Sequence, residues 1–339
     1  MDTKNIIAAI SLSAAVIILW ALFFGPSTEE IKQNKTNQEQ VKQEQTQKSS
    51  DAPSLDQDEN FLKQSRKEAL AENERIEFEN NNIIGTINTV GATIDDLTFE
   101  QYNTELNSNK KVTLLNPRKV ENGYLIESGF VTNNKNIDVP NASTKWEIVG
   151  NKKLTDKNPI KLVWSNSQGI TFEKNISLDD QFLFTIKEKI INSSEKTYNF
   201  YSYAQIKRLR KPQISGFYIL HEGFQAVLDD ELIEEDYDDI QEKKFSRNAS
   251  KGWLGIGDKY WITSIIPPEN KDFKTTFDYK KKFRANYIST EGIEVGSNDT
   301  IEEEIRIIVA AKKVETIDGY AESLNINKFD LVIDFGVLY

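Results

Sequence analysis

The chain has 339 residues, and its 42 Lys and Arg against 53 Asp and Glu give a net charge of −11. It has no cysteine and one histidine, His221, which excludes disulfide scaffolds, cysteine-ligated metals, thiol nucleophiles and multi-histidine metal sites. The acidic balance argues against a nucleic-acid binder, which needs a basic face to neutralise phosphates. With 38% hydrophobic and 10% aromatic residues, the chain can form a sizeable core.

An apolar run at the N-terminus, residues 6–24, is interrupted only by Ser11 and Ser13. A helix of this length spans roughly the hydrocarbon core of a bilayer. The run is too long for a cleavable signal peptide and lacks a small-residue cleavage site. Because Lys4 precedes it and acidic residues follow it, we expect a cytoplasmic N-terminus and export of the rest. We predict a membrane anchor over 1–24, with Ile6, Ile10, Val16, Trp20, Phe23 and Phe24 in the bilayer.

A polar segment follows the apolar run. Residues 25–60 contain seven glutamines, eight acidic residues, four lysines and no aromatic residue. Such a composition cannot bury enough apolar surface to offset the entropy lost on folding. We predict a disordered polar linker over 25–72, of which 61–71 is either a short helix or the end of the linker.

From about residue 75 the pattern becomes that of β-strands, separated by turns rich in Asn, Gly and Pro. The β-rich runs are 83–90, 112–115, 123–126, 160–164, 170–178, 182–191, 198–206, 261–266, 284–289 and 303–310. Many short strands with few helical segments predict a mainly β fold, a large antiparallel β-sandwich. The runs 182–191 and 198–206, separated by Asn192, Ser193 and Ser194, predict one long antiparallel hairpin.

Two segments follow the last strand. Val314, Ile317, Ala321 and Leu324 recur at helical spacing, which predicts a short C-terminal amphipathic helix. Residues 327–339 become increasingly apolar and lack a polar tail, which predicts the start of a truncated second membrane segment. The folded domain is therefore expected over 73–326.

Polar groupings in this domain are the candidates for chemistry or binding. His221 beside Glu222 would allow general-base catalysis, but a single loop histidine favours a structural role. Residues 229–239 hold eight acids and lack the EF-hand pattern, so we expect a solvated acidic loop rather than a calcium site. The basic clusters 207–211 and 280–284 either meet anionic lipid or an acidic partner, or are strand ends on a solvated face. We predict no catalytic residue, cofactor or metal.

One segment, 249–267, is more specific than these groupings. Its marked residues are a Gly-Trp step, an aromatic pair and a closing proline: Gly252, Trp253, Tyr260, Trp261 and Pro267. In this segment the chain resembles the YidC-type membrane protein insertases of Gram-negative bacteria, which carry such a signature in their large periplasmic domain. We interpret the aromatic residues as sandwich core or domain-to-membrane packing rather than a ligand site.

Other segments are similar to the same family, in the same order along the chain. The N-terminal Met1, Asp2 and Asn5 resemble its anchor. Residues 91–97 with Tyr102 resemble an early strand pair, and 169–174 resemble a Gly-x-Thr-Phe-x-Lys strand. Residues 329–336 resemble the entrance to the second membrane helix, with Asp330, Asp334, Phe335 and Gly336 as the matching positions.

The resemblance implies a periplasmic β-super-sandwich held to the bacterial inner membrane by one helix. In the family, five further membrane helices form a hydrophilic groove that inserts proteins, alone or with the Sec translocon, and this part lies beyond Tyr339. The implied partners are the lipid bilayer, nascent inner-membrane proteins and Sec translocon components, and the chain as given is not expected to insert proteins by itself. The alternatives are a membrane-anchored carbohydrate-binding sandwich and a single-pass periplasmic scaffold.

Overall fold

The computed structural model describes residues 63–212 and 221–333. The chain divides into two units, 1–49 and 50–339, and only the second contains described residues. Predictions that lie outside the described residues are the anchor, with Ile6, Ile10, Val16, Trp20, Phe23 and Phe24, most of the linker, and Asp334, Phe335 and Gly336. Within 63–212 and 221–333, no helix is long and apolar enough to cross a membrane.

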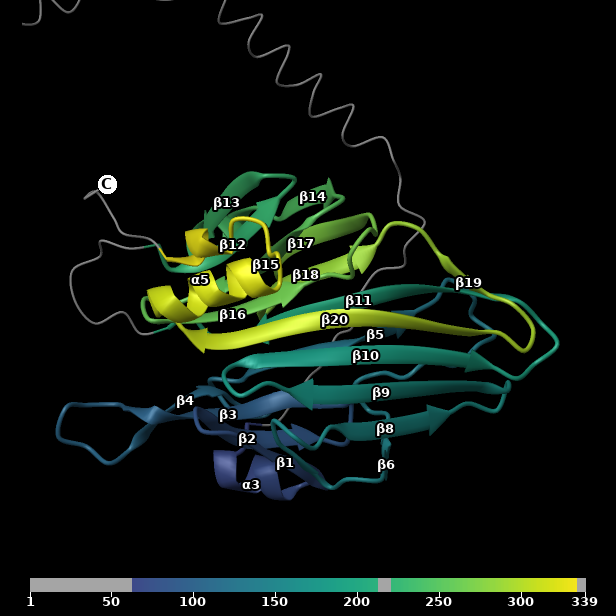
Figure 1. Ribbon diagram of the computed structural model, residues 1–339, viewed down its shortest axis with the longest axis horizontal. Coiled ribbons are helices and arrows are strands. Elements are labelled where there is room, and N and C mark those ends of the chain that lie inside the picture. Colours follow the sequence, from purple (N-terminus) through teal and green to yellow (C-terminus); the bar gives the residue numbers. More distant parts are fainter. Residues whose placement is uncertain (1–62, 213–220, 334–339) are drawn as a thin grey trace, which may run out of the picture. The chain divides into compact units, whose positions relative to one another are not determined.

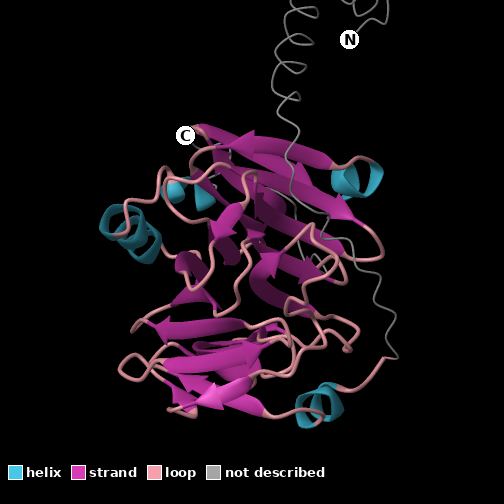
Figure 2. Ribbon diagram, turned by 90° about the vertical axis from the view of Figure 1, so that its right-hand side faces the viewer, coloured by secondary structure: helices cyan, strands magenta, loops and turns pink. Residues whose placement is uncertain are grey.

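Two mainly antiparallel sheets form the folded body (Figure 1), and Figure 2 shows the helices at the margins of the strands. The strands of the first sheet are β1 (Arg75–Glu79), β2 (Ile83–Asn88), β3 (Thr93–Asn103), β4 (Lys111–Leu115), β5 (Tyr124–Val131), β7 (Lys153–Leu154), β11 (Tyr198–Arg208), β14 (Phe245–Ala249), β17 (Phe273–Tyr279), β18 (Phe283–Ser289) and β19 (Ile293–Val295). This 11-stranded sheet has the order β14-β17-β18-β11-β5-β3-β2-β1-β7, with β19 beside β11 and β4 beside β3.

The second sheet packs against the first. Its strands are β6 (Glu147–Val149), β8 (Ile160–Ser165), β9 (Ile170–Leu178), β10 (Leu183–Asn192), β12 (Gly223–Leu228), β13 (Glu231–Asp236), β15 (Gly252–Gly257), β16 (Trp261–Ile266) and β20 (Thr300–Ala311). This 9-stranded sheet has the order β13-β12-β15-β16-β20-β10-β9-β8-β6. The helices within the described residues are α3 (Arg66–Ala71), α4 (Tyr237–Glu242), α5 (Val314–Ser323) and a short 3-10 helix, η1 (Phe329–Val332).

The core lies between the facing surfaces of the two sheets. Alternate residues of β9, from Ile170 to Leu178, are buried, because successive side chains of a strand point to opposite faces. Phe172 of β9 meets Phe200 of β11 edge-on, with ring centroids 5.7 Å apart. Phe78 of β1 meets Phe184 of β10 in the same way at 5.2 Å. The predicted mainly β sandwich is confirmed, while its membrane helix stays a prediction.

Strands β10 and β11 do not form the hairpin predicted from the sequence. β10 pairs with β9 and β20, whereas β11 pairs with β5, β18 and β19, so the chain passes from one sheet to the other. The Asn192 side-chain amide donates to the carbonyl oxygens of Lys196, Val295 and Gly296, at 2.7, 3.0 and 2.8 Å. The segment after β10 is therefore a crossover, which these bonds hold against the connection that precedes β20.

The acidic run 229–239 is not the solvated loop that we expected. Asp229 and Asp230, with φ of 50° and 73°, form the two-residue turn between β12 and β13. The acids that follow lie on β13, at the edge of the second sheet, and on α4. Edge strands commonly carry charged side chains, which oppose pairing with other chains.

Short helices flank the sheets. α3 lies inside the range 25–72 that we assigned to the linker, and a Ser65–Glu68 capping box begins it. The predicted C-terminal helix is α5, which buries Ile317 and Tyr320, while Val314, expected on the apolar side, is 46% exposed. In η1, Phe329 and Val332 are buried, so 329–332, which we assigned to a membrane segment, packs on the sandwich.

Candidate functional site

The marked segment 249–267 forms the hairpin of β15 and β16, and it begins at a position that requires glycine. Gly252 has a φ of +138°, and a Cβ there would lie 1.8 Å from the carbonyl oxygen of Val227 on β12. Without a Cβ, β15 can pair closely with β12. Pro267, at the far end of the segment, is buried just beyond β16.

Trp253 joins this hairpin to the C-terminal segment. Its side chain is fully buried, and its ring meets Phe329 edge-on with centroids 5.3 Å apart. The indole Nε1 donates to the carbonyl oxygen of Asn327 at 3.2 Å. Buried aromatic pairs of this geometry contribute beyond their buried area. The fold thus brings the marked segment 249–267 into contact with Phe329, the first residue of the family-like segment 329–336. Asp330, the next residue, is exposed.

Polar contacts surround this pair of rings. Asp230, in the turn between β12 and β13, accepts from Asn327 Nδ2 at 2.6 Å and pairs with Lys251 at 2.8 Å. Its backbone carbonyl accepts from Lys328 Nζ at 2.8 Å. Hydrogen bonds from Lys251 and Asn327 lower the pKa of Asp230 below its ordinary value. The C-terminal junction, as we name this set, consists of Asp230, Lys251, Trp253, Asn327, Lys328 and Phe329.

The sequence analysis did not find the polar half of the C-terminal junction. Two adjacent acids between two β-rich segments could have indicated a hairpin turn at Asp229 and Asp230. The partner of Asp230, Asn327, is 97 residues away along the chain. Nothing in the pattern of either segment indicates the other.

The aromatic pair of the marked segment divides between core and surface. Trp261 stacks on Phe99 at 4.5 Å and meets Tyr102 edge-on at 5.1 Å. Tyr260 is 59% exposed, and Lys259 Nζ lies 5.1 Å from the centre of its ring. Trp261 therefore belongs to the sandwich, whereas Tyr260 is available at its surface.

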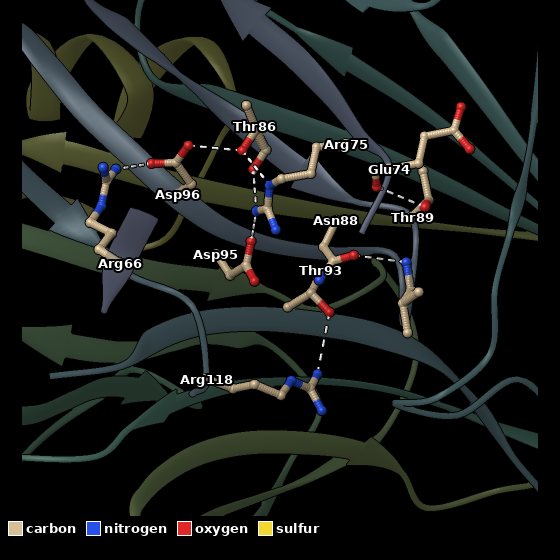
Figure 3. A network of polar contacts seen from close by, with 11 residues as sticks. Arg66, Glu74, Arg75, Thr86, Asn88, Thr89, Thr93, Asp95, Asp96 and Arg118 are labelled. Atoms are coloured by element: carbon tan, nitrogen blue, oxygen red, sulfur yellow. Dashed lines mark hydrogen bonds and ion pairs between the residues drawn. The ribbon is translucent and has the colours of Figure 1, made fainter. Parts of the chain in front are cut away.

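Figure 3 shows a network of charges that attaches α3 to β1, β2 and β3. Arg75 pairs with Asp95, and its Nε donates to Thr86 Oγ1 at 2.6 Å. Thr86 donates to Asp96 at 2.8 Å, and Asp96 pairs with Arg66 of α3. Burial raises the pKa of Asp95, and the charge of Arg75 opposes this. Each carboxylate faces a guanidinium, an arrangement that fixes structure rather than activating a base.

The basic cluster 207–211 is neutralised by carboxylates of the same chain. The pairs are Lys207–Glu127, Arg208–Asp258, Arg210–Glu121 and Lys211–Asp238. The Lys207 and Glu127 side chains are both only 6% exposed, so a strand end on a solvated face is wrong for Lys207. Burial acts to raise the pKa of Glu127, but Lys207 and Arg118 outweigh it and leave that pKa below its ordinary value. In the second basic cluster, 280–284, Arg284 is buried and its Nε lies 2.6 Å from Asp278 Oδ1.

His221 contacts the hairpin that follows it. Its Nε2 lies 3.1 Å from the carbonyl oxygen of Phe224, and its Nδ1 lies 3.4 Å from Asp236. These contacts fit the structural role that we favoured. Among the residues that the structure describes, no group of three His, Asp or Glu is placed to hold a metal ion.

Lys174 lies between the two sheets. It is the last residue of 169–174, one of the segments that resemble the family. It pairs with Glu188 of β10, and its Nζ donates to the carbonyl oxygen of Ser128 on β5 at 2.7 Å. Ser128 in turn donates to Glu188 at 2.6 Å. The Lys174 and Glu188 side chains are 3% and 1% exposed. Lys174, Ser128 and Glu188, which we call the inter-sheet clamp, form a polar contact across the core.

The family model described as the YidC periplasmic domain matches residues 75–339. The chain belongs to the YidC family. The membrane protein insertase YidC of Pelagibacter ubique is 68% identical over 339 residues, which are 100% of this chain and 60% of that protein. The Rickettsia prowazekii protein of the same name is 35% identical over 99% of this chain and 60% of its own length. The chain thus spans about 60% of these YidC relatives.

The family assignment confirms the YidC-type resemblance that the marked segments indicated. A galactose mutarotase related enzyme from Lactobacillus acidophilus has a similar structure, with a TM-score of 0.50 over 70% of this chain and 97% of the enzyme. At 10% identity, this likeness shows the sandwich fold alone. It gives the carbohydrate-binding alternative no support beyond the fold.

Proposed function

We propose that the chain is the membrane anchor and periplasmic domain of a membrane protein insertase of the bacterial inner membrane. The observation that carries this proposal is the match of the YidC periplasmic domain to 75–339, together with 68% identity along the whole chain to a YidC insertase. In the proposed arrangement the N-terminus is cytoplasmic, 1–24 cross the membrane, the linker follows, and the sandwich is periplasmic.

The proposed partners are the lipid bilayer, nascent inner-membrane proteins and components of the Sec translocon. Insertion transfers a polypeptide into lipid without making a covalent bond, so it requires shielding of polar groups rather than a nucleophile. We assign insertion itself to the part of the relatives that this chain does not span. The sandwich then serves to position that part, because the C-terminal junction fixes where the chain leaves the two sheets.

The test is complementation in bacterial cells depleted of their own insertase. This chain is fused to the remainder of the Pelagibacter ubique relative, and a reporter membrane protein is followed by protease accessibility of its periplasmic loop. We expect the fusion to restore insertion to the level of the intact relative. The matched control is the chain alone, which is expected to reach the inner membrane without restoring insertion. A fusion that is present in the membrane at equal amount but leaves the reporter uninserted contradicts the proposal.

A further inference from the structure

The most exposed apolar side chains of the described residues gather at one end of the sandwich. Leu106 is 102% exposed, Tyr260 is 59% exposed and Val314 is 46% exposed. Leu106 lies in the connection between β3 and β4, and Figure 1 shows this hairpin projecting beyond its sheet, at the end where β20 passes into α5. Single exposed apolar residues are common on soluble proteins, so their position together is what requires an explanation.

Contacts at the base of the hairpin join the three segments that carry these residues. Tyr102 of β3 meets Trp261 edge-on at 5.1 Å, and Lys313 Nζ lies 5.7 Å from the Tyr102 ring. The backbone nitrogen of Lys312 donates to the Tyr260 carbonyl at 2.9 Å. The segments that carry Leu106, Tyr260 and Val314 are therefore in mutual contact, at Tyr102 for the hairpin and directly beside Tyr260 and Val314 for the other two. We call this part of the molecule the hairpin end.

Lysines accompany the apolar residues at the hairpin end. The lysines within five positions of Leu106, Tyr260 or Val314 are Lys110, Lys111, Lys259, Lys312 and Lys313. The carboxylates within the same distance are Glu105, Asp258, Glu315 and Asp318, of which Asp258 pairs with Arg208. Lysine thus exceeds carboxylate here, although the whole chain has a net charge of −11. Lys259 and Lys313 each lie over a tyrosine ring with exposed side chains, so their charges stand beside apolar surface.

We propose that the hairpin end binds the surface of a bilayer that contains anionic lipids. Leu106 and Val314 enter the headgroup region, and Tyr260 takes the interfacial position that tyrosine prefers. The lysines contact lipid phosphates while their alkyl stems cover the apolar side chains. The local positive charge attracts an acidic protein surface as well as lipid phosphate. We favour lipid because the surface of an anionic bilayer presents phosphate at high density. This inference rests on the proposed membrane location of the chain.

The absence of cysteine allows a site-specific test on the full chain. Single-cysteine variants Leu106→Cys, Tyr260→Cys and Val314→Cys are labelled with an environment-sensitive fluorophore and reconstituted into vesicles of phosphatidylcholine and phosphatidylglycerol. The control is Val149→Cys on β6, which is 44% exposed and lies away from the hairpin end (Figure 1). We expect blue-shifted emission and quenching by spin-labelled lipid at the first three positions, and neither at the control.

Charge reversal tests the role of the lysines. Lys259→Glu and Lys313→Glu are each expected to weaken the lipid-dependent response by about fivefold, and raised salt is expected to weaken it further. If the chain floats with the vesicles but all four labels remain in water, the proposal is overturned. If the chain fails to float, the proposed membrane location fails instead. Labels that do not respond to lipid but become protected by an added purified membrane protein would also overturn the lipid-binding proposal, in favour of a protein partner.

Discussion

At the scale of single residues, Trp253 carries the contact between the marked segment and the C-terminal segment. Trp253→Ala removes a fully buried ring and its contact with Phe329, so we expect a loss of about 3–5 kcal/mol in the free energy of unfolding. Urea-induced unfolding of the full chain in mild detergent measures this loss. Tyr260→Ala, seven positions away and 59% exposed, is the control and should change stability by less than about 0.5 kcal/mol. Equal effects of the two changes would contradict the proposed junction.

Glu127 predicts a dependence of stability on pH. Its lowered pKa in the folded state stabilises the fold fully above the pKa of the unfolded state, about 4.3, and this contribution is lost as pH falls through the lower folded pKa. Glu127→Gln removes the carboxylate that pairs with buried Lys207 and half-buried Arg118, and should cost about 3–5 kcal/mol at neutral pH. The difference between wild type and variant should shrink below about pH 4, as the wild-type carboxylate becomes protonated.

Denaturant titrations at several pH values measure this difference directly. The matched control is Glu304→Gln, whose side chain is 36% exposed and pairs with Lys187 at 3.9 Å and Arg306 at 3.0 Å at the surface. Exposed pairs contribute little, so the control should differ from wild type by less than about 1 kcal/mol at every pH. A cost of Glu127→Gln that stays constant from neutral to acidic pH would refute the role given to this carboxylate.

At the scale of elements, α3 is a short helix that a capping box begins and that ion pairs attach to the rest of the domain. The Ser65 side chain accepts from the backbone nitrogen of Glu68, and Arg66 pairs with Asp96 of β3. Ser65→Ala should cost about 1 kcal/mol, and hydrogen exchange should rise at the Ala69 amide but not within β1 to β3. Lys67→Ala, at an exposed neighbouring position, serves as the control and should leave exchange at Ala69 unchanged. Faster exchange throughout the sheet would mean that α3 is not a separate element.

Strand positions could be predicted from the sequence, but strand partners could not. Burial alternates along β9 and most of β10, because one face of each strand is buried, whereas β11 is buried on both faces and stands out by its run of β-forming residues. Both signals come from residues that are neighbours along the chain. Pairing depends on distant residues. The Asn192 amide, which holds the crossover, bonds to Val295 and Gly296, so nothing near the Asn-Ser-Ser turn reveals that β10 and β11 part.

The acidic run illustrates the same limit for composition. Eight acids in eleven positions indicate exposure to water, and that much is correct for most of β13. Exposure does not distinguish a loop from an edge strand, because an edge strand also faces water. The buried charges were missed for the opposite reason. Lys207 and Glu127 are surface residues by type, and both are buried because Glu127 pairs with Lys207 and with Arg118.

At the scale of the whole molecule, the inter-sheet clamp is where the two sheets meet through polar groups. Glu188→Gln leaves Lys174 buried without a charged partner, so we expect a cost of about 3–5 kcal/mol in the free energy of unfolding. The double change Lys174→Met with Glu188→Leu removes both charges and fills similar volume, and should recover most of that stability. Urea titrations of Lys174→Met, Glu188→Leu and the double variant give the coupling between the residues.

The control for this cycle lies on the same strand. Lys187 of β10 and Glu304 of β20 form an exposed pair at 3.9 Å, for which the coupling should stay below about 1 kcal/mol. A coupling at Lys174 and Glu188 as small as that of the exposed pair would mean that water or relaxation replaces the clamp. A large coupling would mean that a polar contact fixes how the two sheets face one another, since apolar packing alone tolerates several arrangements of similar volume. In that case the orientation of the C-terminal junction on one sheet relative to α3 on the other is set by these buried charges as well as by the core.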